Sequence, residues 1–129
     1  CVHAILAARI GRMDKAYEFY LRTSRLDLDD YNREVAEGLH ITSMAGTWMS
    51  VVQGFGGMRW EGDTLHLEPS IPDQWTRYSF HLRFRNGIIE LQVDQESATL
   101  KHLSGKPVQL YVFGEVIELN EGQEQKVKH

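Results

Sequence analysis

The stretch VVQGFGGM at residues 51–58 decides the fold, because the hydrophobic pattern of the sequence changes there. From Val2 to Gly54 apolar residues recur at spacings of three and four, which is typical of helices that bury one face. From Met58 to Leu119 apolar and polar residues alternate, which is typical of strands. The sequence therefore predicts a helical segment, residues 1–57, followed by a β domain, residues 58–129.

The helical segment is expected to hold three main helices. The first runs from Val2 to about Ile10, the second begins near Asp14, and the third runs from Thr42 or Ser43 through Gln53. Three helices of this size cannot cover one another's apolar faces. We therefore expect this segment to pack against further helices of a longer polypeptide.

The β domain is expected to be a small antiparallel β-sandwich or jelly roll of about six strands, which makes the chain an α+β protein. Its clearest element is a hairpin in which Phe80–Phe84 and Ile89–Val93 alternate on either side of Asn86-Gly87, two residues that tolerate positive φ. Residues 120–129 are polar, and we expect them to be frayed.

Composition excludes several classes of function. The net charge of −4 argues against nucleic acid as a partner. The single cysteine rules out an internal disulfide, and the histidines lack the spacing of a metal site, so no metal is expected. No apolar run is long enough to span a membrane. The single cysteine fits a reducing cytoplasm, and we predict a cytoplasmic protein.

One turn could carry chemistry: residues 38–48, GLHITSMAGTW, place His40, Thr42, Ser43, Ala45 and Gly46 at the expected start of the third helix. Free N–H groups and the helix dipole favour an anion there, and the hydroxyl groups and the imidazole can donate hydrogen bonds. A Ser or Thr at this place is, however, more often a simple helix cap. Residue types alone leave both interpretations open.

Two other stretches are interpreted structurally. The aspartates at positions 27, 29 and 30 are adjacent acids near a helix end, and we interpret them as solvated or capping groups rather than a cation site. The glycine-rich stretch at residues 54–57 follows a helix instead of preceding one, so its amides do not lie at a positive dipole end. We interpret it as a helix end and linker.

Several blocks taken together resemble the successive C-terminal motifs of glycoside hydrolase family 65. The blocks are CVHAILAARIG at 1–11, LDLDD at 26–30, GLHITSMAGTW at 38–48 and GFGGMR at 54–59, and residues 65–75 are similar to the family's linker into its C-terminal sheet domain. Their order and spacing match as well. The resemblance covers nearly the whole chain.

The resemblance implies the last helices of an (α/α)6 barrel followed by a C-terminal jelly roll. Most members of the family are phosphorylases of maltose, trehalose, kojibiose or nigerose, which release β-glucose 1-phosphate with inversion. Their catalytic Glu lies upstream, so the resemblance implies no catalytic residue in this chain, which alone would be inactive. It also implies a homodimer when intact, and phosphate as co-substrate without any cofactor.

The resemblance also selects the anion interpretation of residues 38–48. It implies that His40, Thr42, Ser43, Ala45 and Gly46 bind phosphate, although Ala is also common in the family where Thr42 stands. Two alternatives remain. A family hydrolase such as a trehalase would need no phosphate site, and a free-standing carbohydrate-binding β-sandwich would show Trp75 and Tyr78 exposed on a sheet face.

Overall fold

The computed structural model describes residues 1–30, 33, 36 and 38–129. The chain forms two compact units, residues 1–57 and residues 58–129, each with its own internal packing. Among the described residues, no helix combines the length and the apolar character needed to cross a membrane.

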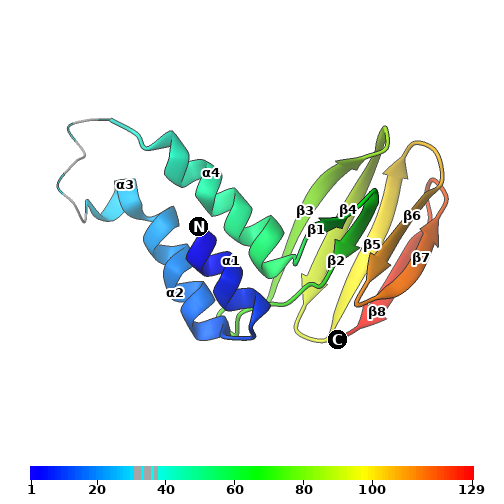
Figure 1. The fold of residues 1–129 in the computed structure, drawn as a ribbon, viewed down its shortest axis with the longest axis horizontal. Coiled ribbons are helices and arrows are strands. Elements are labelled where there is room, and N and C mark those ends of the chain that lie inside the picture. The colour runs from blue at the N-terminus through cyan, green and yellow to red at the C-terminus, as the bar shows by residue number, and fades with distance from the viewer. Residues whose placement is uncertain (31–32, 34–35, 37) are drawn as a thin grey trace. The chain divides into compact units, whose positions relative to one another are not determined.

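The first unit is helical (Figure 1). In chain order it consists of α1 (Val2–Arg9), α2 (Met13–Ser24), the short α3 (Leu26–Asp29) and α4 (Ile41–Met49), which continues into the π-helical turn η2 (Ser50–Phe55). The predicted third helix is thus confirmed, although it begins at Ile41 and extends one residue past Gly54. Its last turn widens because the Gly56 N–H donates to the carbonyl of Val51 at 2.7 Å, five residues back.

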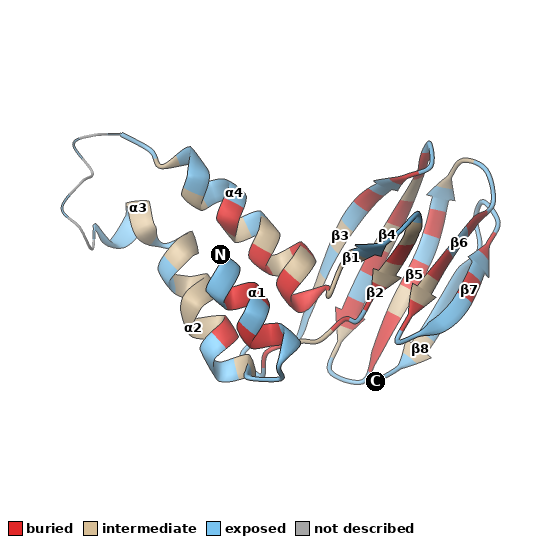
Figure 2. Ribbon diagram, in the orientation of Figure 1, coloured by how far each residue is buried: buried red, intermediate tan, exposed pale blue. Residues whose placement is uncertain are grey.

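Small residues allow these helices to approach closely. Ala4, Ala7 and Ala8 of α1 and Ala16 of α2 are buried, as the red bands of Figure 2 show. Gly46 of α4 is buried as well, and a Cβ at this position would lie 3.0 Å from the Cys1 Cβ and 3.2 Å from the Thr23 Cγ2. Gly46 therefore brings α4 against α2 and the chain's first residue.

The outer surfaces of the same helices are apolar and exposed. The large side chains that remain open to solvent within this unit are Val2, Leu6, Ile10, Leu28, Leu39, Ile41, Met44 and Trp48. Trp48, the largest of these side chains, exposes 53% of its surface. Such a concentration of uncovered apolar side chains is typical of a surface that packs against other protein.

The second unit holds two four-stranded sheets within the residues described (Figure 1). One sheet has the order β1-β2-β6-β7 and the other the order β3-β4-β5-β8. The strands are β1 (Arg59–Glu61), β2 (Thr64–Leu67), β3 (Arg77–Phe84), β4 (Gly87–Asp94), β5 (Ser97–Ser104), β6 (Val108–Val112), β7 (Glu115–Leu119) and β8 (Glu124–Lys128). The buried side chains alternate along the strands, so each sheet has one apolar face and these faces make the core.

The α+β class with mainly antiparallel sheets is confirmed, but three expectations for the β domain were wrong. The described residues form eight strands rather than about six, and β2 pairs with β6 in parallel. The end of the chain is not frayed, because β8 pairs with β5, with Val127 opposite Ala98. Its charged residues are typical of an edge strand, which carries little hydrophobic signal.

The hairpin β3–β4 is confirmed with its turn one residue earlier than predicted. Phe84 pairs with Gly87, so the two turn residues are Arg85 and Asn86, with φ of 47° and 64°. Gly87 itself is buried in β4, where a Cβ would lie 2.7 Å from the carbonyl oxygen of Ser104. Glycine is required there by the approach of β5 and not by the turn.

Candidate functional site

The first turn of α4 holds the residues that the sequence singled out. His40 is the N-cap residue, with φ −86° and ψ 88°, and Thr42 and Ser43 lie inside the helix. The side chain of the N-cap residue makes no capping hydrogen bond. The simple capping role that the residue types allowed for Thr42 and Ser43 is therefore not the one they have in the structure.

Two backbone amides at this helix end point out of the helix without an acceptor among the described residues. The carbonyl of His40 accepts hydrogen bonds from the N–H of Ser43 at 2.9 Å and of Met44 at 3.2 Å. The N–H groups of Ile41 and Thr42 have no such partner in the part of the chain that is described. Together with the positive end of the helix dipole, these donors favour an anionic ligand.

Asp27 of α3 holds His40 at two points. Asp27 Oδ2 accepts a hydrogen bond from the backbone N–H of His40 at 2.9 Å, and Asp27 Oδ1 lies 2.5 Å from His40 Nδ1. The side chains are largely covered, with 17% of Asp27 and 28% of His40 exposed. One carboxylate thus fixes both the backbone and the ring of the residue at which α4 begins.

This contact also sets the protonation pattern of the pair. The hydrogen bond from the His40 ring, aided by the one from the His40 backbone, lowers the pKa of Asp27 below its ordinary value. An ionised carboxylate only accepts hydrogen bonds, so Nδ1 of His40 carries the proton. Nε2 of this ring could then donate a hydrogen bond only from the doubly protonated imidazole.

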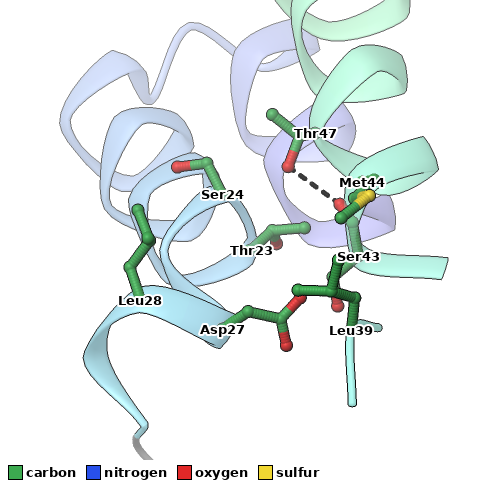
Figure 3. Close-up of a pocket in the computed structure, with 8 residues that line it drawn as sticks. All are labelled: Thr23, Ser24, Asp27, Leu28, Leu39, Ser43, Met44 and Thr47. Carbon is green, nitrogen blue, oxygen red and sulfur yellow. Dashed lines mark hydrogen bonds between the residues drawn. The ribbon is translucent and has the colours of Figure 1, made fainter. Parts of the chain in front are cut away.

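A pocket of about 330 Å³ lies beside this turn. Figure 3 shows that Asp27 of α3 and Ser43 of α4 line the same space, together with Thr23 and Ser24 of α2. The remaining lining residues are Leu28, Leu39, Met44 and Thr47, whose hydroxyl donates to the Ser43 carbonyl at 2.8 Å. The pocket combines a hydroxyl donor and a carboxylate with apolar walls.

The other two predicted site residues lie further along α4. Ala45 is exposed one helical turn after Ile41, whereas Gly46 is buried against Cys1 and Thr23. Within the helical unit, then, His40, Thr42 and Ser43 share the helix end, and Gly46 contributes through packing.

Asp27 is the residue of this cluster that sequence reasoning missed. The aspartates of this stretch were interpreted as solvated or capping acids, whereas Asp27 binds His40 and Asp29 pairs with Arg25 through two hydrogen bonds of 2.7 Å. That pair fixes the single turn of α3 from which Asp27 extends. The contact joins residues 13 positions apart, so no short-range pattern in the sequence predicts it.

The aromatic pair named for a sugar-binding module does not form an exposed platform. Trp75 and Tyr78 are half-buried and meet edge to face, with ring centroids 5.8 Å apart. The Tyr78 hydroxyl donates to the Ser70 carbonyl at 2.8 Å, and burial raises the pKa of this phenol well above its ordinary value. Both rings therefore belong to the internal packing of the β unit.

Comparisons with known proteins match both units to one family. Residues 1–49 match the model described as the glycosyl hydrolase family 65 central catalytic domain, and residues 58–119 match the family 65 C-terminal domain. These two matches cover most of the chain.

Individual relatives agree with the family models. The chain is 46% identical over 118 residues to a maltose phosphorylase of Bacillus subtilis (strain 168), covering 92% of this chain and 16% of the relative. It is 43% identical over 122 residues to an α,α-trehalose phosphorylase of Thermoanaerobacter brockii, covering 95% of this chain and 16% of the relative. The chain thus spans about one sixth of the length of these relatives.

A solved structure has the same architecture. It is described as a candidate kojibiose phosphorylase from the human microbiome, and it matches with a TM-score of 0.91 and 34% identity. The match covers 99% of this chain and 19% of the other.

Proposed function

Because the chain belongs to glycoside hydrolase family 65, we propose that it is the C-terminal part of an inverting disaccharide phosphorylase and supplies the phosphate-binding turn. The intact enzyme would convert an α-linked glucose disaccharide and phosphate into β-glucose 1-phosphate and glucose. The names of the relatives, which include maltose, trehalose and kojibiose phosphorylases, support this class of reaction.

The observation that carries the proposal is the chemistry of the first turn of α4. Two amide N–H groups without an acceptor in the described chain, the hydroxyls of Thr42 and Ser43 and the imidazole of His40 gather at the positive end of the helix. None of the residues in that turn is acidic. Such a set of donors forms stronger hydrogen bonds with a negatively charged phosphate oxygen than with a neutral water molecule.

In the proposed reaction, a phosphate oxygen attacks the anomeric carbon as the glycosidic bond breaks on the opposite face. A carboxylic acid protonates the departing oxygen, and the proton ends on the released glucose. Since phosphate is itself the nucleophile, one enzyme acid suffices. We place that Glu in the part of the enzyme upstream of this chain, so that this chain holds and orients the nucleophile.

Within the turn, the proposal gives the five residues different tasks. His40, Thr42 and Ser43 would contact phosphate through Nε2, the two hydroxyls and the amides of the first turn. Ala45 keeps the neighbouring helix surface free of bulk. Gly46 would act indirectly, because its lack of a Cβ seats α4 against Cys1 and Thr23.

The rest of the same polypeptide is the proposed partner of the helical unit. The exposed apolar side chains of α1 and α4, among them Val2, Leu6, Met44 and Trp48, support packing against upstream helices of an (α/α)6 barrel. A homodimer and a cytoplasmic location belong to the same proposal by family analogy.

The second candidate function is hydrolysis by the same fold, with water in place of phosphate. The intact enzyme should be incubated with maltose, trehalose and kojibiose in turn, with and without phosphate, and the products assayed. We expect glucose 1-phosphate from at least one disaccharide only when phosphate is present. Equal release of free glucose with and without phosphate would establish the hydrolase instead.

The isolated chain provides the matching control. These 129 residues alone should show no turnover of any of the three disaccharides, because the acid is placed elsewhere. Measurable turnover would overturn that placement.

A further inference from the structure

We propose that Asp27 is a positioning residue for phosphate, which fixes the orientation and the tautomer of the His40 ring at the proposed anion site. This inference rests on the proposed function and deepens it. Asp27 does not touch the anion and acts only through His40.

The first support is the geometry of the contact. A carboxylate that merely capped α4 would bind the backbone N–H, and one that merely paired with the imidazole would bind the ring. Asp27 does both, at 2.9 Å and 2.5 Å, with its two different oxygen atoms. The ring of His40 is thereby fixed relative to the helix axis, so that the ring and the helix amides keep a constant position relative to each other.

The second support is the charge at the helix end. A lone carboxylate beside the start of α4 would repel a phosphate dianion. With Nδ1 donating to Asp27, the His40 ring can donate to an anion through Nε2 only when it is doubly protonated, and the carboxylate offsets that positive charge. The pair then carries no net charge, and the ring presents a charged donor to the anion.

The third support comes from what an amide would do at this position. Asparagine has one acceptor oxygen, and the backbone N–H of His40 requires it. The amide NH₂ would then face Nδ1, which accepts a hydrogen bond only after losing its proton. Asp27→Asn therefore preserves size and the backbone contact but removes the acceptor for the Nδ1 proton.

The test measures steady-state kinetics of the intact enzyme for Asp27→Asn, with Asp29→Asn as the matched control on the same helical turn. Asp29 pairs with Arg25 and has no contact with His40. We expect Asp27→Asn to raise the KM for phosphate by about tenfold or more. The analogy is the loss of a residue that orients a metal-binding His, which weakens metal binding by a similar factor. The KM for the disaccharide should stay within about twofold of wild type in both variants, since surface substitutions outside a binding site usually have small effects.

A double-mutant cycle shows whether Asp27 acts through His40. In the His40→Ala background, adding Asp27→Asn should change the phosphate KM by no more than about twofold, since the residue through which Asp27 acts has already gone. A full additive effect in the double variant would overturn the inference. So would an equal rise in both KM values, or a phosphate KM unchanged by Asp27→Asn.

The same set of variants separates this inference from the proposed function. If His40→Ala raises the phosphate KM and Asp27→Asn does not, only the role of Asp27 fails. If neither His40→Ala nor Ser43→Ala raises the phosphate KM, the phosphate-binding turn fails and the inference fails with it. Should Asp27→Asn not fold, Asp27→Glu replaces it, because the extra methylene displaces the carboxylate from both contacts and predicts the same selective rise.

Discussion

The carboxylate of Asp27 binds His40 twice, through Oδ2 to the backbone N–H and through Oδ1 to ring Nδ1. The chain reaches from α3 to the start of α4 between these two residues, and this contact ties the two helices together at the candidate site. Its consequences extend to stability as well as to binding.

The first prediction concerns acid. Because the pKa of Asp27 is lower in the folded protein than the ordinary value of about 3.9, its stabilising effect is present above that pH. The effect is lost as the pH falls through the folded pKa, where the carboxyl group gains a proton. Urea unfolding followed by helical circular dichroism should show wild type more stable than Asp27→Asn at pH 6, with the difference shrinking below about pH 4. A difference that grows towards acid would contradict the pairing.

The second prediction concerns Tyr78 in the β unit. Burial raises the pKa of its phenol, while its hydroxyl donates to the Ser70 carbonyl. Tyr78 should therefore stay protonated in the folded protein at a pH where exposed tyrosines, with an ordinary pKa of about 10, have ionised. Spectrophotometric titration of wild type and Tyr78→Phe should give the same number of ionising phenols up to the onset of alkaline unfolding. One fewer in the variant would mean that Tyr78 titrates normally.

The hairpin illustrates how far the sequence determined the β unit. Alternation of apolar residues located β3 and β4, because each strand buries one face. The turn was placed one residue late, since Asn-Gly favours positive φ locally while Gly87 is in fact needed where β5 passes. β8 was missed because an edge strand exposes polar side chains and leaves no apolar pattern.

Adding a Cβ at position 87 should therefore lower the stability of the β unit. The new methyl group in Gly87→Ala would lie 2.7 Å from the Ser104 carbonyl oxygen and 3.0 Å from His102 Nε2. We expect a loss of about 1–3 kcal/mol in the free energy of unfolding, as for other overpacked sites. Asn86→Gly is the control, because its positive φ suits glycine, and it should change stability by no more than about 0.5 kcal/mol. Equal stability of Gly87→Ala and wild type, measured by urea unfolding, would contradict the close approach.

The candidate site was only partly predictable for a related reason. His40, Thr42 and Ser43 lie together in sequence, so the helix-start pattern identified them. Asp27 belongs to the same cluster through a tertiary contact, and residue types near a helix end could not distinguish it from Asp29, which pairs with Arg25. The resemblance implied that Gly46 binds phosphate, and its neighbours in the structure are Cys1 and Thr23.

The central claim is that the first turn of α4 binds phosphate, and the most direct measurement is the phosphate KM of the intact enzyme carrying His40→Ala or Ser43→Ala. Loss of a hydrogen bond to a charged ligand costs about 1.5–3 kcal/mol, so each change should raise the phosphate KM by roughly 10- to 100-fold with little change in the disaccharide KM. Phosphate KM values equal to wild type in both variants would contradict the account.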